Sequence, residues 1–121
     1  MKNAITLLGS TGSIGRQTLD VCRQMGIPVA ALAAHHSVDL LEKQVREFRP
    51  ALAVLYDIDA AMELARRVSG LPVRVAYGME GLAEAASLPE SGTVVAAMVG
   101  MVGLQPTLAA IRQGKRIALA N

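Results

Sequence analysis

Three glycines at intervals of three residues are the first feature of this sequence that could bind a ligand. Gly9, Gly12 and Gly15 directly follow the apolar run 4–8 and open a predicted helix. Glycines let the backbone approach a ligand closely, and the free N–H groups at the start of a helix attract an anion. The hydroxyls of Ser10, Thr11 and Ser13 could add hydrogen bonds to phosphate oxygens. The segment 9–15 therefore predicts a site for the pyrophosphate of a dinucleotide.

A second group of polar residues follows the next predicted strand and bears on the choice of cofactor. The sequence there is Ala34-His35-His36-Ser37, with no acidic residue before Asp39. An NAD site usually has a carboxylate at this point, which would repel a 2′-phosphate. Imidazoles, a hydroxyl and the start of a helix could instead donate to that phosphate, so we predict a preference for NADP. Two alternatives stay open, a solvated pair of histidines and a histidine that caps the strand, whereas two adjacent histidines make a poor metal site.

Other candidate groups are weaker. The segment 99–103 has two glycines that could pass beside a cofactor, and Met101 or Val102 could pack on an adenine or nicotinamide ring; an ordinary strand–helix turn explains it equally well. The single cysteine, Cys22, lies on an apolar helical face and is predicted to be a buried hydrophobic residue. No pair of nucleophile and base stands out, so we predict no catalytic and no metal-binding residue in this sequence.

The elements that must position these groups alternate regularly between short apolar runs and amphipathic segments. This alternation predicts one α/β domain, a Rossmann-like, doubly wound parallel sheet of about six strands in a three-layer α/β/α arrangement. Ligands of such sheets bind beyond the carboxyl ends of the strands, which places the loops 9–15, 34–37 and 99–103 and the last residue, Asn121, at the site. The alternating pattern of Val73-Arg74-Val75 favours a position near the edge of the sheet. The predicted strands are Ala4–Leu8, Val29–Ala33, Ala51–Leu55, Val73–Ala76, Thr93–Met98 and Arg116–Ala120; the predicted helices are Ser13–Met25, Val38–Phe48, Asp59–Gly70, Met79–Ser87 and Pro106–Gly114.

Composition excludes several classes of function. The chain has 121 residues, 52% of them apolar, which suffices for one core. One Phe, two Tyr and no Trp leave little for stacking on bases, and a net charge of +2 without a dense basic cluster gives no footprint for nucleic acid. No signal peptide and no apolar run long enough to span a bilayer are found, so we expect a soluble, cytoplasmic protein with no membrane partner.

Two blocks of this sequence resemble the family of 1-deoxy-D-xylulose 5-phosphate reductoisomerases. The resemblance implies that the parent enzyme converts 1-deoxy-D-xylulose 5-phosphate to 2-C-methyl-D-erythritol 4-phosphate in non-mevalonate isoprenoid biosynthesis. It implies NADPH and a divalent metal, Mn or Mg, as cofactors, a sugar-phosphate substrate, and a homodimer at full length. The blocks are Leu7–Gly15 with Thr18–Val21, and Ala96–Gly100 continuing through Gly103-Leu104 and Pro106–Arg112 to Leu119-Ala120-Asn121.

The same resemblance assigns roles to individual residues. Thr11, Gly12, Ser13 and Ile14 are expected to hold the cofactor phosphates, and Asn121 is expected near the nicotinamide. Where the family often has Gly-Lys-Asn, this chain has His35-His36-Ser37, and His36 and Ser37 are the residues that we expect at the 2′-phosphate. The family's Lys-Glu pair and its acidic metal ligands would follow Asn121. Residues 1–121 are therefore predicted to be a truncated NADPH-binding domain, inactive alone, without the catalytic, metal-binding and C-terminal domains.

Two alternatives belong to other classes of function. One is the cofactor domain of a different NADP oxidoreductase, such as an aspartate-semialdehyde dehydrogenase, which would need a catalytic cysteine further along the chain, or an extended short-chain reductase, whose Tyr-x-x-x-Lys pair is not found in this sequence. The other is a non-catalytic module that senses nucleotides, for which the natural chain would end at Asn121. The residues encoded after Asn121 would separate these cases.

Overall fold

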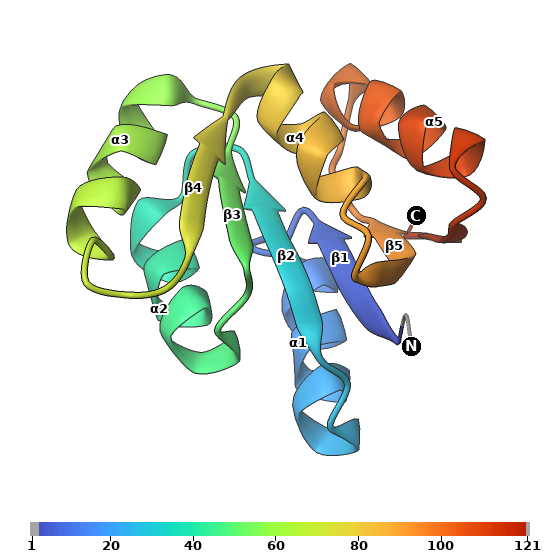
Figure 1. The fold of residues 1–121 in the computed structure, drawn as a ribbon, viewed down its shortest axis with the longest axis horizontal. Coiled ribbons are helices and arrows are strands. Elements are labelled where there is room, and N and C mark those ends of the chain that lie inside the picture. Colours follow the sequence, from blue (N-terminus) through green and yellow to red (C-terminus); the bar gives the residue numbers. More distant parts are fainter. Residues whose placement is uncertain (1–2, 121) are drawn as a thin grey trace.

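A six-stranded parallel sheet is the centre of the structure, a computed structural model that describes residues 3–120 (Figure 1). The strands lie in the order β4-β3-β2-β1-β5-β6, and every neighbouring pair is parallel. This arrangement confirms the predicted doubly wound α/β fold. The elements are β1 (Ala4–Leu8), α1 (Ser13–Met25), β2 (Val29–Ala34), α2 (Val38–Phe48), β3 (Leu52–Leu55), α3 (Ile58–Arg67), β4 (Arg74–Tyr77), α4 (Gly78–Ala86), β5 (Ser91–Ala96), a short 3-10 turn η1 (Met101–Gly103), α5 (Leu104–Arg112) and β6 (Arg116–Leu119).

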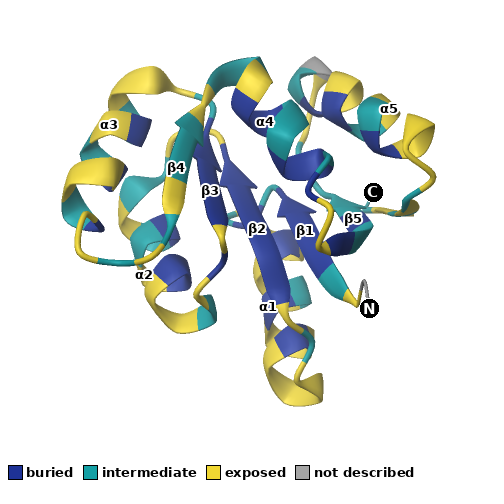
Figure 2. Cartoon of the chain, in the orientation of Figure 1, coloured by how far each residue is buried: buried dark blue, intermediate teal, exposed yellow. Residues whose placement is uncertain are grey.

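Helices cover the sheet on two faces, so that the core forms two apolar clusters. Helices α1, α2 and α3 pack on one face, where Leu7 of β1 meets Leu19 and Leu41. Helices α4 and α5 pack on the other face, where Leu8 meets Leu82 and Ala110. Strands β2 and β3 are buried along their whole length, as Figure 2 shows in dark blue, because helices lie on both of their faces.

The predicted boundaries are mostly correct to within about two residues, and the differences have local causes. Strand β5 begins at Ser91 rather than Thr93, because Ser91 pairs with Ala4 of β1, and it ends at Ala96 rather than Met98. Helix α5 begins at Leu104 rather than Pro106, which still lies in the first turn, where proline is tolerated. Helix α3 ends at Arg67 rather than at the predicted Gly70. Strand β4 forms an edge of the sheet, as its alternating sequence predicted.

One buried polar contact ties β1 to the face covered by α4. Thr6 is fully buried, its hydroxyl donates to the carbonyl oxygen of Ala85 at 2.8 Å, and the Ser91 hydroxyl lies 2.5 Å from the Thr6 hydroxyl. Thr6→Val keeps the shape of the side chain but leaves the Ala85 carbonyl and the Ser91 hydroxyl without this partner. Since an orphaned buried group costs about 1–3 kcal/mol, we expect the unfolding free energy to fall by roughly 2 kcal/mol. Urea unfolding followed by circular dichroism checks this value, and an unchanged midpoint would contradict it.

Candidate functional site

Strands β2 to β4 extend the sheet on one side of β1, and β5 and β6 extend it on the other side. The candidate site lies at the carboxyl end of β1. Strand β2 flanks β1 on one side and β5 flanks it on the other, so the loops that follow β1 and β5 diverge above the sheet. Ligands of open α/β sheets bind at such a crevice. The loop 9–12 connects β1 to α1 at this point, as predicted from the glycines (Figure 1).

Gly9 and Gly15, the first and third glycines of the motif, are required by packing within the protein. Gly9 has a φ of 95°, and a Cβ atom there would lie 2.6 Å from the backbone of Ala97 in the segment after β5. At Gly15 a Cβ atom would lie 2.0 Å from the carbonyl oxygen of Gly9, so helix α1 can approach the loop only because residue 15 has no side chain. Both glycines therefore shape the loop and hold the helix against it.

The second glycine differs, because the space around it is open. Gly12 is exposed, with φ −80° and ψ 177°, a conformation that any residue adopts, and the nearest neighbour of a Cβ atom would be the Gly9 oxygen at 4.0 Å. No packing reason for a glycine is found at this position among residues 3–120. The open space lies directly over the first turn of α1, where a bound group could approach the backbone.

The start of α1 offers unpaired hydrogen-bond donors. Gly12 is the N-cap of this helix and provides no side-chain cap, and the first turn contains no acidic residue. The N–H groups of Thr11 and Gly12 have no hydrogen-bond partner among residues 3–120. By contrast, the Asp57 carboxylate already accepts a hydrogen bond from Ala60 N–H at the start of α3. The donors at α1, together with the positive end of its dipole, suit an anion such as a pyrophosphate.

The three hydroxyls of the loop lie in different surroundings, and one expectation is wrong. The side chain of Ser13 is exposed and that of Thr11 is half-buried, so both are accessible beside Gly12. Ser10 is fully buried, so its hydroxyl faces the interior and does not take part in the accessible site. Its Oγ atom has no hydrogen-bond partner among the described residues. Burial follows from the backbone, because Gly9 and Ser10 both donate their N–H groups to the Ala33 carbonyl, at 2.7 and 2.9 Å.

The histidine loop lies at the carboxyl end of β2, the strand next to β1. His35 and His36 are exposed, their Nδ1 atoms are 3.1 Å apart, and the His35 ring lies 5.2 Å from the ring of Tyr56. Ser37 is the N-cap of α2, and its hydroxyl makes no capping hydrogen bond. The loop therefore places two imidazoles and a hydroxyl at the start of a helix, and their contact with a 2′-phosphate stays a prediction.

The carboxylate that follows this loop in the sequence, Asp39, is held by a cation. Asp39 lies in the first turn of α2, and Arg67 of α3 donates to it at 2.6 Å. Hydrogen bonds to Asp39 and then to Glu63 raise the pKa of Arg67 above its ordinary value. Arg66 and Arg67 in turn lower the pKa of Glu63 to about 2. The Asp39 charge is thus partly compensated, which reduces its repulsion of a phosphate at Ser37.

The loop after β5 is mostly an ordinary turn. Val102 is half-buried and packs with Met98 against the cluster under α4 and α5, and a Cβ atom on Gly103 would lie 3.2 Å from Met98 Cβ. The expectation that Val102 packs on a cofactor ring is therefore not supported, because the core already occupies this side chain. A cavity of about 220 Å³ nevertheless lies here, lined by Ala96, Gly100, Leu119 and others. Asn121 lies outside the described residues, as does the side chain of Met101.

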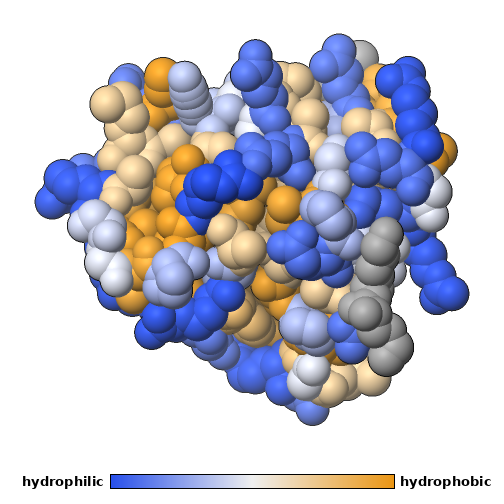
Figure 3. Space-filling model, in the orientation of Figure 1, coloured by the Kyte–Doolittle hydropathy of each residue, from blue (hydrophilic) through white to orange (hydrophobic). Residues whose placement is uncertain are grey.

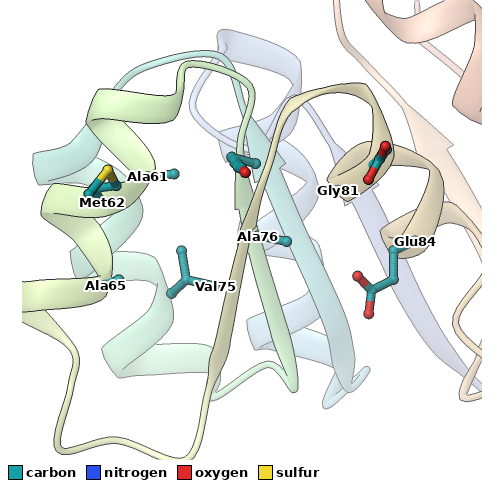
Figure 4. A pocket seen from close by; sticks show the side chains of 9 residues that line it. Ala61, Met62, Ala65, Val75, Ala76, Gly81 and Glu84 are labelled. Carbon is teal, nitrogen blue, oxygen red and sulfur yellow. The ribbon is translucent and has the colours of Figure 1, made fainter.

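Some features lie away from these loops. A surface pocket of about 390 Å³ follows the outer edge of β4, between Met62 and Ala65 of α3 and Glu84 of α4 (Figure 4). Hydrophobic surface gathers on this side of the molecule (Figure 3). The pocket contains none of the predicted site residues. Cys22 is buried in the core as predicted, and burial raises the pKa of its thiol. No helix among residues 3–120 has the length and apolarity needed to cross a membrane.

Fold and loop together define a dinucleotide-binding domain, with the glycine loop at the point where the sheet reverses its direction. Comparison with known proteins gives the particular family: a sequence model described as 1-deoxy-D-xylulose 5-phosphate reductoisomerase matches residues 5–121. The chain belongs to this family, which confirms the resemblance seen in the sequence and argues against a different NADP oxidoreductase.

Similar proteins and structures agree with this assignment. The chain is 46% identical to the 1-deoxy-D-xylulose 5-phosphate reductoisomerase of Ruminiclostridium cellulolyticum over 121 residues, and 52% identical to that of Dechloromonas aromatica, also over 121 residues. These alignments cover 100% and 97% of the chain, but 32% and 30% of the relatives. The solved Zymomonas mobilis enzyme in complex with NADPH matches with a TM-score of 0.93 and 37% identity, covering 100% of this chain and 32% of that one. A reductoisomerase in complex with magnesium matches with a TM-score of 0.94 and 41% identity, over 100% of this chain and 31% of that one.

The chain thus spans about a third of the length of the relatives that it matches. Those relatives are polypeptides about three times as long. Within the described residues, the features that could bind a ligand are the glycine loop, the histidine loop and the cavity beside β6.

One contact of the site could not be found from motifs. Gln44 of α2 is buried, and its side-chain Nε2 atom donates to the carbonyl oxygen of Ser10 at 2.9 Å. A signal does exist in the sequence, because Gln44 is a polar residue on the apolar helical face that contains Leu41, Val45 and Phe48. An amide on such a face indicates a buried partner, but the pattern does not say which one.

Proposed function

We propose that residues 1–121 form the NADPH-binding domain of a 1-deoxy-D-xylulose 5-phosphate reductoisomerase. In this proposal the longer polypeptide converts 1-deoxy-D-xylulose 5-phosphate to 2-C-methyl-D-erythritol 4-phosphate. The observation that carries it is the uncapped start of α1 beneath the open space at Gly12. That the Zymomonas mobilis relative is a complex with NADPH supports the choice of cofactor.

In this proposal the chain binds and orients the cofactor. The N–H groups of Thr11, Gly12, Ser13 and Ile14 hold the pyrophosphate, and the hydroxyls of Thr11 and Ser13 can add hydrogen bonds to it. The cavity lined by Ala96, Gly100 and Leu119 lies on the side of the crevice where the nicotinamide and Asn121 are expected. When bound, NADPH supplies the hydride that reduces the substrate. The protein holds the nicotinamide in one orientation relative to the substrate.

Metal and substrate are assigned to the part of the relatives that this chain does not cover. Among residues 3–120 no group of three or more His, Cys, Asp or Glu side chains could hold a metal ion. Relatives have been solved with magnesium, and two of these structures also contain fosmidomycin. We therefore expect the 121-residue chain to bind NADPH without turning over substrate. Manganese as an alternative metal and a homodimeric assembly stay predictions of the family resemblance, and a cytoplasmic location stays a prediction from the sequence.

Titration of the chain with NADPH and with NADH, followed by cofactor fluorescence, tests this function. The proposal predicts saturable binding with NADPH bound more tightly. Tighter binding of NADH, or no binding of either cofactor by the folded chain, would contradict it.

The preference for NADPH is assigned to the loop after β2. We expect His36→Asp to weaken NADPH binding about tenfold more than NADH binding, because a carboxylate at the start of α2 repels the 2′-phosphate that only NADPH has. His36→Asn is the matched control, since it has nearly the same shape as the aspartate variant without the charge. The ratio of the two dissociation constants is the measured quantity, and an equal loss for both cofactors would remove His36 from the 2′-phosphate site.

A further inference from the structure

We propose that Gln44 is a positioning residue that aims the Thr11 N–H group of the glycine loop at the cofactor phosphates. This inference rests on the proposed function, since it concerns how the same loop is held. Gln44 lies on α2, 34 residues along the chain from the loop, and is only 6% exposed. Gln44 therefore acts on the phosphate loop through its side chain, without itself contacting the cofactor.

The contact fixes one peptide group of the loop. Gln44 Nε2 donates to the Ser10 carbonyl oxygen at 2.9 Å, and this carbonyl belongs to the same peptide unit as the N–H group of Thr11. In a planar trans peptide the C=O and the N–H point in opposite directions. Because the Ser10 oxygen is directed at Gln44, the Thr11 N–H is directed away from it. That N–H group is one of the donors without a partner among residues 3–120.

The preceding peptide groups are held from the other side. The N–H groups of Gly9 and Ser10 both donate to the carbonyl oxygen of Ala33 in β2. The loop is thus held at Gly9 and Ser10 N–H by strand β2, and at the Ser10 carbonyl by Gln44. Within the described residues, the next hydrogen bond along the backbone is the one that Arg16 N–H donates to the Gly12 oxygen at 2.9 Å. Loss of the Gln44 contact would therefore free the peptide groups that face the ligand.

Among the described residues, the contact between Gln44 and Ser10 leaves buried polar atoms without hydrogen-bond partners, which an apolar side chain at position 44 would avoid in part. Within residues 3–120 two buried side-chain atoms have no hydrogen-bond partner, Ser10 Oγ and Gln44 Oε1, and they belong to the two residues of this contact. An unpaired buried polar atom destabilises a fold. An apolar side chain at position 44 would complete the face of Leu41 and Val45 without that cost, but it could not hold the Ser10 carbonyl. The glutamine is thus better explained by the geometry of the loop than by stability.

The test compares Gln44→Met with Thr6→Val in the 121-residue chain. Both substitutions remove a buried hydrogen bond and keep the size of the side chain, but Thr6 contacts Ala85 and Ser91 on the opposite side of the sheet from α2. NADPH titration well below the unfolding temperature is expected to show affinity about tenfold weaker for Gln44→Met and within about twofold of the unaltered chain for Thr6→Val. Without cofactor, amide exchange at Ser10, whose N–H group donates to the Ala33 oxygen, is expected to quicken only in Gln44→Met.

The outcomes separate this inference from the proposed function. If the unaltered chain fails to bind NADPH, the proposed function is wrong; if it binds and Gln44→Met binds equally well, only the role of Gln44 is wrong. Should Gln44→Met not fold, Gln44→Leu replaces it, because leucine is a good helix former that suits the apolar face of Leu41 and Val45 and has no donor for the Ser10 oxygen. In the unaltered chain, the side-chain amide resonance of Gln44 should also shift when NADPH is added, and a resonance that stays in place would overturn the inference.

Discussion

Gly12→Val is expected to weaken NADPH binding about 100-fold or more, because the branched side chain would fill the space through which the pyrophosphate reaches the N–H groups of α1. Loss of two charge-assisted hydrogen bonds would cost roughly 3 kcal/mol, which corresponds to this factor. The fold should survive the change. The backbone at Gly12 is extended, and a Cβ atom there meets only the Gly9 oxygen at 4.0 Å. We expect the unfolding free energy to fall by only about 1 kcal/mol, because valine is a poorer N-cap residue than glycine.

Gly70→Val is the matched control for this experiment. Gly70 is also exposed and follows α3, away from the loop, and a Cβ atom there would have no neighbouring atom within 4 Å. Isothermal titration with NADPH and urea unfolding are measured on both variants. Gly70→Val should bind like the unaltered chain. Undiminished binding by Gly12→Val would show that no pyrophosphate lies over the first turn of α1.

Gly15→Ala is expected to lower the unfolding free energy by about 3 kcal/mol, at the upper end of what overpacking usually costs. The new Cβ atom would lie 2.0 Å from the Gly9 oxygen and 2.8 Å from Ser10 Cα, and both are backbone atoms that cannot rotate away. Helix α1 would have to move off the loop. The sign of the effect is informative, because glycine to alanine inside a helix ordinarily stabilises a protein by about 0.5–1 kcal/mol.

Urea unfolding of Gly15→Ala and of Gln17→Ala provides the comparison. Gln17 is an exposed neighbour in α1, so its substitution should change the unfolding free energy by less than about 0.5 kcal/mol. A Gly15→Ala chain as stable as the unaltered one would mean that α1 does not pack directly against the Gly9 carbonyl.

The fold could be predicted from the sequence because its signals are local. The runs 29–34 and 52–55 are apolar without alternation, which indicates strands covered on both faces. Gly26 ends α1 in the left-handed conformation, with φ 67° and its N–H donating to the Cys22 oxygen, as its place before Pro28 predicted. Boundaries such as the start of β5 were less accurate, because they depend on pairing with Ala4 on a strand far away in the sequence.

The site could be predicted only in outline. The spacing of the glycines located the loop, but their separate roles depend on contacts with Ala97 and with Gly9 itself, which spacing does not reveal. The inward orientation of Ser10 follows from hydrogen bonds to Ala33, a residue of another strand. Gln44 was missed for the same reason, because its partner lies 34 residues away. The glycine motif is visible in the sequence, whereas Gln44, which contacts the motif from another helix, is visible only in the fold.

The most direct measurement of the central claim is an NMR titration of the 121-residue chain with NADPH, read at the backbone amides. If α1 and its glycine loop bind the pyrophosphate, the largest shifts will occur at Thr11, Gly12, Ser13 and Ile14. Largest shifts at the β4 edge instead, for example at Val75 and Tyr77, would contradict this claim.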